Sequence, residues 1–289
     1  MKYLITGAGG QLGREWVHYA RAKGYTASAL TSSDLDITNE NWVNKVINHE
    51  APDVVINCAA YTKVDQAESE REKAFSVNAD GVKYLAEACE KSGAKIVHYS
   101  TDYVFAGNLS DRETYPHGYT EDIECNPANV YGKSKQSGEI ALMGSGAEFL
   151  LIRISWLCGR FGSNFVKTML RLASEREEVS VVNDQFGSPS FAGDVAEKTD
   201  ALIRKNLRGI YHISSIGELT WADFAEQVFL EKGTGTIVKR ISSDEYPTKA
   251  KRPAYSLLCN KKMEKAGIKP LVWNDGLSML MKQLNEVEN

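Results

Sequence analysis

Tyr131 and Lys135 place a phenol and an ammonium four positions apart in the sequence. The stretch from Asn129 to Glu139 contains no proline and predicts the start of a helix, so the two side chains share one helix face. A lysine beneath a tyrosine favours the phenolate and lowers a pKa that is ordinarily near 10. Such a tyrosine exchanges a proton with a substrate oxygen near neutral pH. Because most pairs at this spacing lie on a solvated helix face, the interpretation needs further residues.

Thr101 supplies the first of these residues, at the end of the apolar run that precedes Asp102. In an open parallel sheet, ligands bind outside the carboxyl ends of the strands. Thr101 would then donate a hydrogen bond to a substrate, Tyr131 would donate a proton, and Lys135 would tune the phenol. This set predicts reduction of a carbonyl group, in which a cofactor delivers hydride to carbon and Tyr131 protonates the developing alkoxide.

A glycine-rich turn follows the first apolar run and opens a helical pattern. Glycines allow a tight turn and close approach of the backbone to a pyrophosphate, and the helix N-terminus supplies N–H donors. Strand, glycine turn and helix in this order are the context that supports a dinucleotide site. The cofactor-binding candidates in this turn are Gly7, Gly10, Gln11, Leu12 and Gly13.

The identity of the dinucleotide depends on the end of the second predicted strand. An acidic residue there would bind the ribose 2′-hydroxyl and select NAD. The sequence offers Thr31, Ser32 and Ser33, with Asp34 only after them. We therefore expect NADP(H) to be favoured, with NAD(H) also possible, since no arginine is present to demand a 2′-phosphate.

Further candidates for cofactor binding follow the second and third predicted strands. Asp36 and Ile37 are candidates for the adenine edge and face, and Asp36 alternatively caps a helix or turn. Small side chains at a strand end let a flat cofactor lie against the backbone. The candidates at the third strand end are Ala59, Ala60, Tyr61 and Thr62.

The elements that must position these residues alternate between short apolar runs and helical patterns. This alternation predicts an α/β fold with a doubly wound, Rossmann-type parallel sheet covered on both faces. We expect a dinucleotide-binding domain over 1–155, with sheet contributions from about 179–213, and a smaller, interleaved α/β lobe over about 156–289 that binds substrate. The predicted strands are Lys2–Thr6, Thr26–Leu30, Asp53–Cys58, Lys95–Ser100, Glu148–Ile154, Val179–Val182 and Gly209–Ile213.

The second half of the sequence is less regular. Helices are predicted over Trp221–Glu231 and Asp275–Leu284, and loops over Asn183–Phe191 and Ser242–Tyr255. The segment Ala106–Asn126 reads as one long polar connection. A connection of that length in a compact domain is more often functional than idle.

Composition excludes several classes of protein. The 289 residues are 43% hydrophobic and 25% charged with a net charge of −4, which is ordinary for a soluble globular protein and gives no sign of a nucleic-acid or membrane partner. No apolar run approaches the roughly 18 residues of a membrane span. The five cysteines have no metal-ligand spacing, so no metal site is expected. We expect a cytoplasmic protein with reduced thiols, and a monomer and a homodimer are both open.

The glycine turn, Thr101 and the Tyr131/Lys135 pair resemble the extended short-chain dehydrogenase/reductases and, among them, the dTDP-4-dehydrorhamnose reductases. The resemblance runs to about residue 258. Its more specific segments lie in the second half of the chain. The segments that carry it are Asn57–Asp65, Ser100–Phe105, Arg153–Trp156, Asn164–Met169, Asp184–Pro189 and Arg252–Ser256.

The resemblance implies reduction of the 4-keto group of a nucleotide sugar, with Thr101, Tyr131 and Lys135 as catalytic residues. It also implies that Asn78 lies near the active site. The residues that it places at the sugar or its diphosphate are Val64, Asp65, Asp102, Tyr103, Trp156 and Arg252. The sequence departs from the family pattern at Ile154, Cys158 and Ser190, and in a longer stretch over Gly107–Tyr119.

Three alternative functions share parts of this pattern. A nucleotide-sugar 4,6-dehydratase needs a second carboxylate after the threonine, where this chain has Tyr103, so elimination is disfavoured. Another nucleotide-sugar 4-ketoreductase or an epimerase stays open. A non-catalytic dinucleotide-binding regulatory subunit would have no need of a tuned phenol.

Overall fold

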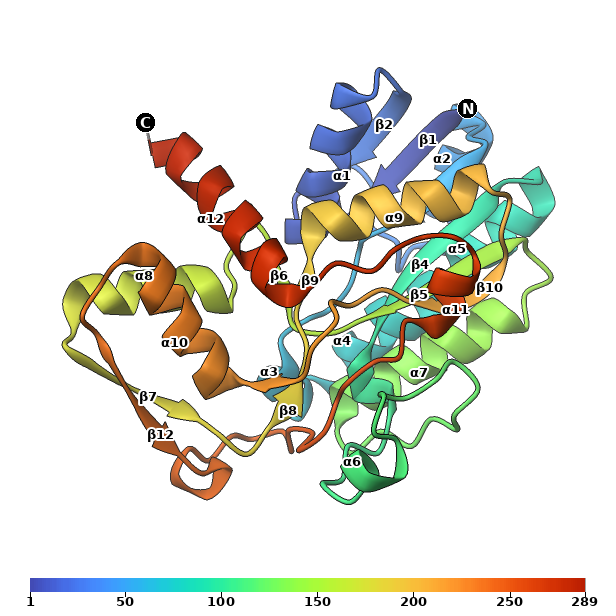
Figure 1. Cartoon of the computed structure of the whole chain (residues 1–289). Helices are drawn as coiled ribbons and strands as arrows, with labels where there is room; N and C mark the ends of the chain where they lie inside the picture. Colours follow the sequence, from blue (N-terminus) through green and yellow to red (C-terminus); the bar gives the residue numbers. More distant parts are fainter. Residues whose placement is uncertain (289) are drawn as a thin grey trace.

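A six-stranded parallel sheet forms the centre of the protein, for which a computed structural model describes residues 1–288 (Figure 1). The strand order is β10-β5-β4-β3-β1-β2, and every neighbouring pair is parallel. The doubly wound α/β fold predicted from the sequence is therefore confirmed. The strands are β1 (Lys2–Thr6), β2 (Thr26–Leu30), β3 (Val54–Asn57), β4 (Lys95–Thr101), β5 (Phe149–Ile154) and β10 (Gly209–His212).

Helices cover both faces of this sheet, as Figure 1 shows. On one face, α1 (Gln11–Ala22) and α9 (Ala192–Arg204) pack against alternate strand residues. On the other face, α2 (Glu40–Glu50), α5 (Gly81–Ser92) and α7 (Val130–Met143) pack against the residues between them. Because both faces are covered, the central strands are continuous apolar runs, and every residue of β3 is buried.

The helix predicted around Tyr131 is α7. The side chain of Asn129 caps it by accepting a hydrogen bond from the backbone N–H of Gly132 at 2.8 Å. Two of its glycines let α7 approach its neighbours closely. A Cβ at Gly132 would lie 2.2 Å from the carbonyl oxygen of Tyr103, and one at Gly138 would lie 2.0 Å from that of Asn78. The position of α7 over the sheet therefore depends on these two residues.

The change Gly138→Ala is expected to lower the free energy of unfolding by about 1–3 kcal/mol, because a rigid backbone oxygen occupies the space of the new methyl group. The helix must shift, so kcat should fall as well. Gly144→Ala, at the end of the same helix, is the matched control, since its Cβ would lie 3.4 Å from the nearest atom. Urea denaturation of both variants checks this, and equal stabilities would contradict the proposed close packing.

A second, smaller part of the chain lies beside the sheet. Its core contains α8 (Phe165–Glu175), α10 (Trp221–Lys232) and α12 (Trp273–Glu288) against β7 (Glu178–Val182), which pairs with β12 (Ile237–Ile241). Of the sheet contributions predicted over about 179–213, β10 joins the six-stranded sheet. The prediction is wrong for β7, because β12 provides its partner. A domain boundary near residue 155 stays a prediction.

The predicted loops contain short elements that propensity does not reveal. Over Asn183–Phe191 the chain forms two short strands, each paired with a partner distant in the sequence. The two strands are β8 (Phe186–Gly187) and β9 (Ser190–Phe191). Their partners are β11 (Leu219–Thr220) for β8 and β6 (Leu157–Cys158) for β9. The remaining helices are α3 (Val64–Ala67), α4 (Arg71–Phe75), the π-helix η1 (Ser76–Asp80), α6 (Asp111–Thr114), α11 (Lys261–Lys265) and the 3-10 helices η2 (Asp102–Val104) and η3 (Ser243–Glu245).

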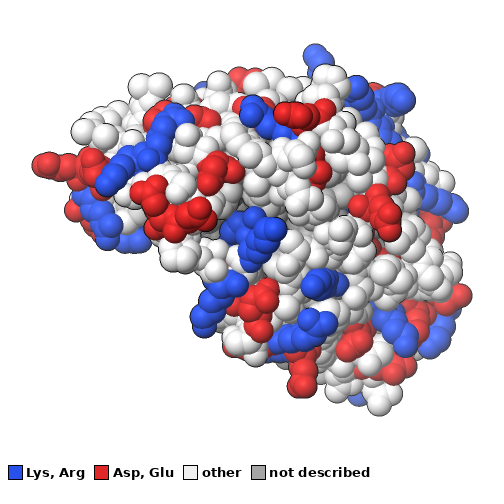
Figure 2. Space-filling model, turned by 90° about the horizontal axis from the view of Figure 1, so that it is seen from below, with Lys and Arg blue, Asp and Glu red and all other residues white. Residues whose placement is uncertain are grey.

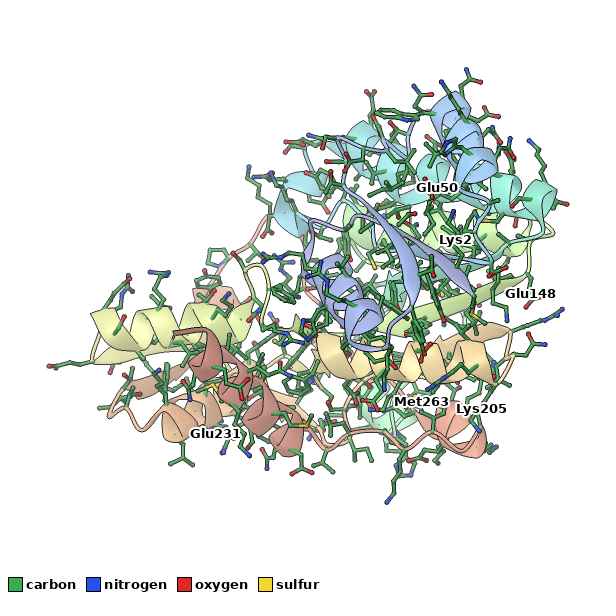
Figure 3. All side chains as sticks on the ribbon, turned by 90° about the horizontal axis from the view of Figure 1, so that it is seen from above. Lys2, Glu50, Glu148, Lys205, Glu231 and Met263 are labelled. Carbon is green, nitrogen blue, oxygen red and sulfur yellow. The ribbon has the colours of Figure 1, made fainter. Side chains whose placement is uncertain are left out.

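The surface carries both signs of charge. Acidic and basic side chains are intermixed over the face in Figure 2, which fits the small net charge. Lys2 of β1 and Glu50 at the end of α2, labelled in Figure 3, form an ion pair of 3.2 Å. Met263 of α11, also labelled there, is fully buried in the core that contains α1 and α9. Among the described residues, no helix is long and apolar enough to cross a membrane.

Candidate active site

A cavity of about 730 Å³ lies at the carboxyl ends of the sheet strands, between the sheet and the smaller part of the chain. The glycine turn and the ends of β3, β4 and β5 line it, together with residues that follow β5 and residues of α8 and α10. The sequence-predicted residues that it brings together are Gly10, Gln11, Leu12, Ala59, Ala60, Thr62, Val64, Thr101, Asp102, Tyr103, Tyr131, Lys135 and Trp156.

Thr101 and Tyr131 lie at the centre of this set. The Thr101 hydroxyl donates a hydrogen bond of 2.9 Å to Asp102 Oδ1. Burial raises the pKa of Tyr131 above its ordinary value, and a hydrogen bond with Thr101 is the largest opposing effect. The sequence predicted a lowered pKa for this phenol. That prediction is wrong for this structure, because removal from water outweighs the neighbouring hydrogen bond.

Lys135 is buried one turn further along α7. Its Nζ donates a hydrogen bond of 2.6 Å to the carbonyl oxygen of Tyr99 and lies 3.2 Å from Nε2 of His98. Burial lowers the pKa of Lys135 to about 8. The lysine therefore has the predicted place in the cavity, but its amine contacts β4, and no contribution of Lys135 to the Tyr131 pKa is resolved.

Asp102 is a second buried acid at the site. Its side chain is 3% exposed, and burial raises the pKa of its carboxyl to about 7, against hydrogen bonds that include the one from Thr101. A carboxyl that titrates near neutral pH beside a candidate proton donor is typical of a functional site. Asp102 lies where the sequence analysis expected it, in the wall of the cavity.

The glycine turn has the shape that a pyrophosphate requires. Gly7 has a φ of 62°, and a Cβ on it would lie 2.5 Å from the backbone nitrogen of Ala59. A Cβ on Gly13 would lie 2.1 Å from the Gly7 carbonyl oxygen. These two glycines shape the turn without lining the cavity. No side chain caps the N-terminus of α1 at Gly10, and its first turn holds no acidic residue, so its N–H groups fit an anionic group such as a dinucleotide pyrophosphate.

Tyr61 and Asn78 do not reach the cavity. Asn78 lies in η1, fully buried, and its amide binds the backbone N–H of Tyr61 at 2.8 Å and the backbone carbonyl oxygen at 3.0 Å. It also donates to the Ser134 hydroxyl of α7 at 2.9 Å. Their expected places, Tyr61 at the cofactor and Asn78 near the active site, stay predictions. Asn78 fastens the loop after β3 to the helix that carries Tyr131.

The residues after β2 bear on whether the protein selects NAD or NADP. Asp36 is exposed and accepts hydrogen bonds from the N–H and hydroxyl of Thr38, which is the alternative turn role, and Ile37 is buried in the core. Asp34 turns back onto β2, where it accepts hydrogen bonds from the N–H and hydroxyl of Thr31 at 2.9 and 2.6 Å. The Asp34 carboxylate therefore stands at this strand end, although Asp34 comes later in the sequence, because its side chain reaches back three residues.

Two of the expected substrate residues pair with each other at the rim. Asp65 forms an ion pair with Arg252 and accepts a hydrogen bond from the Ala250 N–H at 3.1 Å. Arg252 donates to the Tyr103 hydroxyl at 3.4 Å. Neither Asp65 nor Arg252 lines the cavity, so the structure places them behind Tyr103, which does.

Trp221 and Phe165 line the cavity and were missed by sequence reasoning. Trp221 begins α10 and stacks on Trp156, with ring centroids 3.7 Å apart and planes at 13°. Trp156 has a φ of 47°, a left-handed conformation that is uncommon for a bulky residue and often marks a functional site. Phe165 lies in a segment that carried the family resemblance, which was the available signal. No sequence signal pointed to Trp221.

Comparison with known proteins agrees with this geometry. The model of the family described as "RmlD substrate binding domain" matches residues 1–286. The chain is 41% identical to the spore coat polysaccharide biosynthesis protein SpsK of Bacillus subtilis, over 98% of this chain and 97% of that protein. It is 43% identical to the dTDP-4-dehydrorhamnose reductase of Aggregatibacter actinomycetemcomitans, over 96% and 97%.

A solved structure shows the same likeness in three dimensions. The dTDP-4-dehydrorhamnose reductase of Bacillus anthracis, crystallised in complex with NADP, superimposes with a TM-score of 0.93 at 39% identity and covers 98% of this chain and 99% of its own. Sequence, fold and the arrangement of the cavity point to one family. This chain belongs to the RmlD family of NAD(P)-dependent nucleotide-sugar reductases.

Proposed function

We propose that this protein reduces the 4-keto group of dTDP-4-dehydro-L-rhamnose to give dTDP-L-rhamnose, with NAD(P)H as the reductant. The observation that carries the proposal is that Thr101, Tyr131 and Lys135 line the same cavity as the glycine turn. The names of relatives about 40% identical over nearly the whole chain support the choice of substrate.

The three side chains have separate roles in the proposed reaction. A bound nicotinamide cofactor supplies the hydride. Burial keeps the pKa of Tyr131 high, so the phenol holds its proton near neutral pH and can give it to the C4 oxygen. The Thr101 hydroxyl lies beside the phenol and can donate to the same oxygen. Lys135 supplies N–H donors from the next turn of α7.

We further propose that NADP(H) is favoured and that NAD(H) is also used. The hydroxyls of Thr31 and Ser33, 2.8 Å apart at the end of β2, support a 2′-phosphate, and a relative binds NADP. The negative charge of the Asp34 carboxylate, beside Thr31, opposes binding of a 2′-phosphate.

Asp34→Asn is therefore expected to raise the ratio of kcat/KM for NADPH to that for NADH by about three- to tenfold, because one negative charge near the 2′-phosphate is removed. Glu40→Gln, which removes an exposed carboxylate in the first turn of α2, should leave the ratio unchanged. Steady-state kinetics with both cofactors checks this. An unchanged ratio in Asp34→Asn would show that the carboxylate does not face the cofactor.

The experiment that tests the function is a competition assay. Purified protein is given dTDP- and UDP-linked 4-keto-6-deoxy sugars, each with NADH and NADPH, and the products are separated by anion exchange. We expect fastest turnover of the dTDP sugar and formation of dTDP-L-rhamnose. Oxidation of the cofactor with a different sugar product would favour another 4-ketoreductase, and binding of NADPH without turnover of any sugar would favour a regulatory subunit.

A further inference from the structure

A row of buried polar side chains crosses the sheet beneath the cavity. Thr6, Asn57 and His98 occupy paired positions on the neighbouring strands β1, β3 and β4. All three are at most 1% exposed, and they share the sheet face that α7 covers. The Thr6 hydroxyl donates to Asn57 Oδ1 at 2.7 Å, and Asn57 Nδ2 lies 3.0 Å from His98 Nδ1. The row ends at Lys135, whose Nζ lies 3.2 Å from His98 Nε2.

The surroundings of Asn57 fix the orientation of its amide. The backbone N–H of Ala59 donates to Asn57 Oδ1 at 3.1 Å, and a backbone N–H can only donate. Exchange of the amide oxygen and nitrogen would set two donors against each other. The amide nitrogen of Asn57 therefore faces His98, so its N–H donates to His98 Nδ1.

This contact fixes the tautomer of His98. Burial, followed by the charge of Lys135, lowers the pKa of His98 well below its ordinary value, so the ring is neutral. A neutral imidazole has one N–H and one lone pair. Because Nδ1 accepts from Asn57, the N–H lies on Nε2 and points at Lys135.

An N–H that points at Lys135 has opposite consequences for the two forms of the lysine. An ammonium has three donors and no acceptor, so its contact with the His98 N–H is repulsive. A neutral amine accepts from the His98 N–H with its lone pair and still donates to the Tyr99 carbonyl oxygen, 2.6 Å away. The arrangement therefore suits the amine better than the ammonium.

We propose that Asn57 holds His98 in the Nε2–H tautomer and that His98 thereby favours the neutral form of Lys135. Both are then positioning residues that act through Lys135, and their effect on catalysis rests on the proposed function. Lys135 becomes a group that releases and regains a proton in the working pH range, where an ordinary lysine stays charged.

Other groups around Lys135 also act on the equilibrium between its neutral and charged forms. Burial lowers the pKa of Lys135 to about 8, while Glu139 on the same helix and Cys58 at the end of β3 raise it. Glu139 is held in an ion pair with Arg153 of β5. The polar and titratable groups that face the lysine from the packed elements are thus His98 and the Tyr99 carbonyl from β4, Cys58 from the β3 end, and Glu139 from α7.

Nuclear magnetic resonance tests the tautomer without any assay of activity. Ring ¹⁵N shifts of labelled histidine report the protonated nitrogen, and the loss of one signal set in His98→Gln assigns His98 among the five histidines. We expect a neutral Nε2–H ring between pH 6 and about 9. A neutral Nδ1–H ring, or a charged one at pH 7, would overturn the inference.

Asn57→Asp tests the effect on Lys135. A carboxylate keeps the bond from Ala59 but only accepts, so it forces His98 into the Nδ1–H tautomer and turns a lone pair toward Lys135. With ¹³Cε-labelled lysine, assigned through Lys135→Met, we expect Lys135 to titrate near pH 8 in the wild type and about one unit or more higher in Asn57→Asp. A wild-type midpoint near that of exposed lysines, or no increase in the variant, would refute the proposal.

A second pair of variants, made in a His98→Leu background, separates the effect of the His98 tautomer on the Lys135 pKa from the effect of the added negative charge. In His98→Leu the ring is gone, so Asn57→Asp then acts on Lys135 by charge alone and the increase should be smaller. An equal increase in both backgrounds would overturn the role of His98.

If the protein turns over a sugar, the basic limb of its kcat–pH profile should move with the Lys135 midpoint. Absence of turnover would count against the proposed function, while the two titrations still decide this inference.

Discussion

Replacement of Tyr131 by phenylalanine is expected to lower kcat by about 10²–10⁴-fold, which is the usual loss when a positioned general acid is removed. The ring itself should stay in place, because it packs edge-on against Tyr103 with centroids 5.6 Å apart. The dissociation constant for NADPH should therefore change little. Stopped-flow measurement of NADPH oxidation, together with fluorescence titration of the cofactor, separates the two effects.

Tyr103→Phe is the matched control for this variant. It removes a hydroxyl from the same cavity wall, where the hydroxyl accepts from Arg252 at 3.4 Å. We expect a smaller loss of kcat than in Tyr131→Phe. Full activity of Tyr131→Phe would eliminate the phenol as the proton donor and shift attention to Asp102, whose carboxyl has a pKa of about 7.

Glu139→Gln is expected to destabilise the protein by about 3–5 kcal/mol, because it leaves the buried guanidinium of Arg153 without its ion-pair partner. Arg153 and Glu139 form a bidentate pair at 3.0 and 2.7 Å, and their side chains are 3% and 1% exposed. The pair joins β5 to the helix that carries Tyr131 and Lys135. Equilibrium unfolding in urea measures the loss.

The exposed pair Arg171–Glu175 on α8 is the control, since its side chains are 59% and 47% exposed. Glu175→Gln should change the free energy of unfolding by less than about 1 kcal/mol, as is usual for surface ion pairs. Similar losses in the two variants would indicate that burial of the Arg153–Glu139 pair does not determine its contribution.

The fold was largely predictable because its signals are local. Continuous apolar runs such as Val54-Val55-Ile56 mark strands buried on both faces, and the glycine turn that opens α1 follows the first of them. The asparagine that caps α7 stands two residues before Tyr131 in the sequence. These patterns place Thr101, Tyr131 and Lys135 at one end of the sheet without reference to distant residues.

The other properties of the site depend on contacts that the sequence does not display. Whether the pKa of Tyr131 rises or falls is decided by its burial, which follows from packing against Tyr103 and the cluster that contains Phe75 and Val77. The Asp34 carboxylate lies at the end of β2 only because its side chain turns back to Thr31. Trp221 reaches the cavity through a stack with Trp156 that joins residues far apart in the chain.

The place of β10 at the outer edge of the sheet has a consequence for synthesis on the ribosome. β5 leaves the ribosome well before its outer partner, and the segments between them belong mostly to the other part of the molecule. Until β10 emerges, the nascent sheet presents a hydrogen-bonding edge on β5, which is a template for association with other chains. We expect truncations that end between these two strands to aggregate during expression.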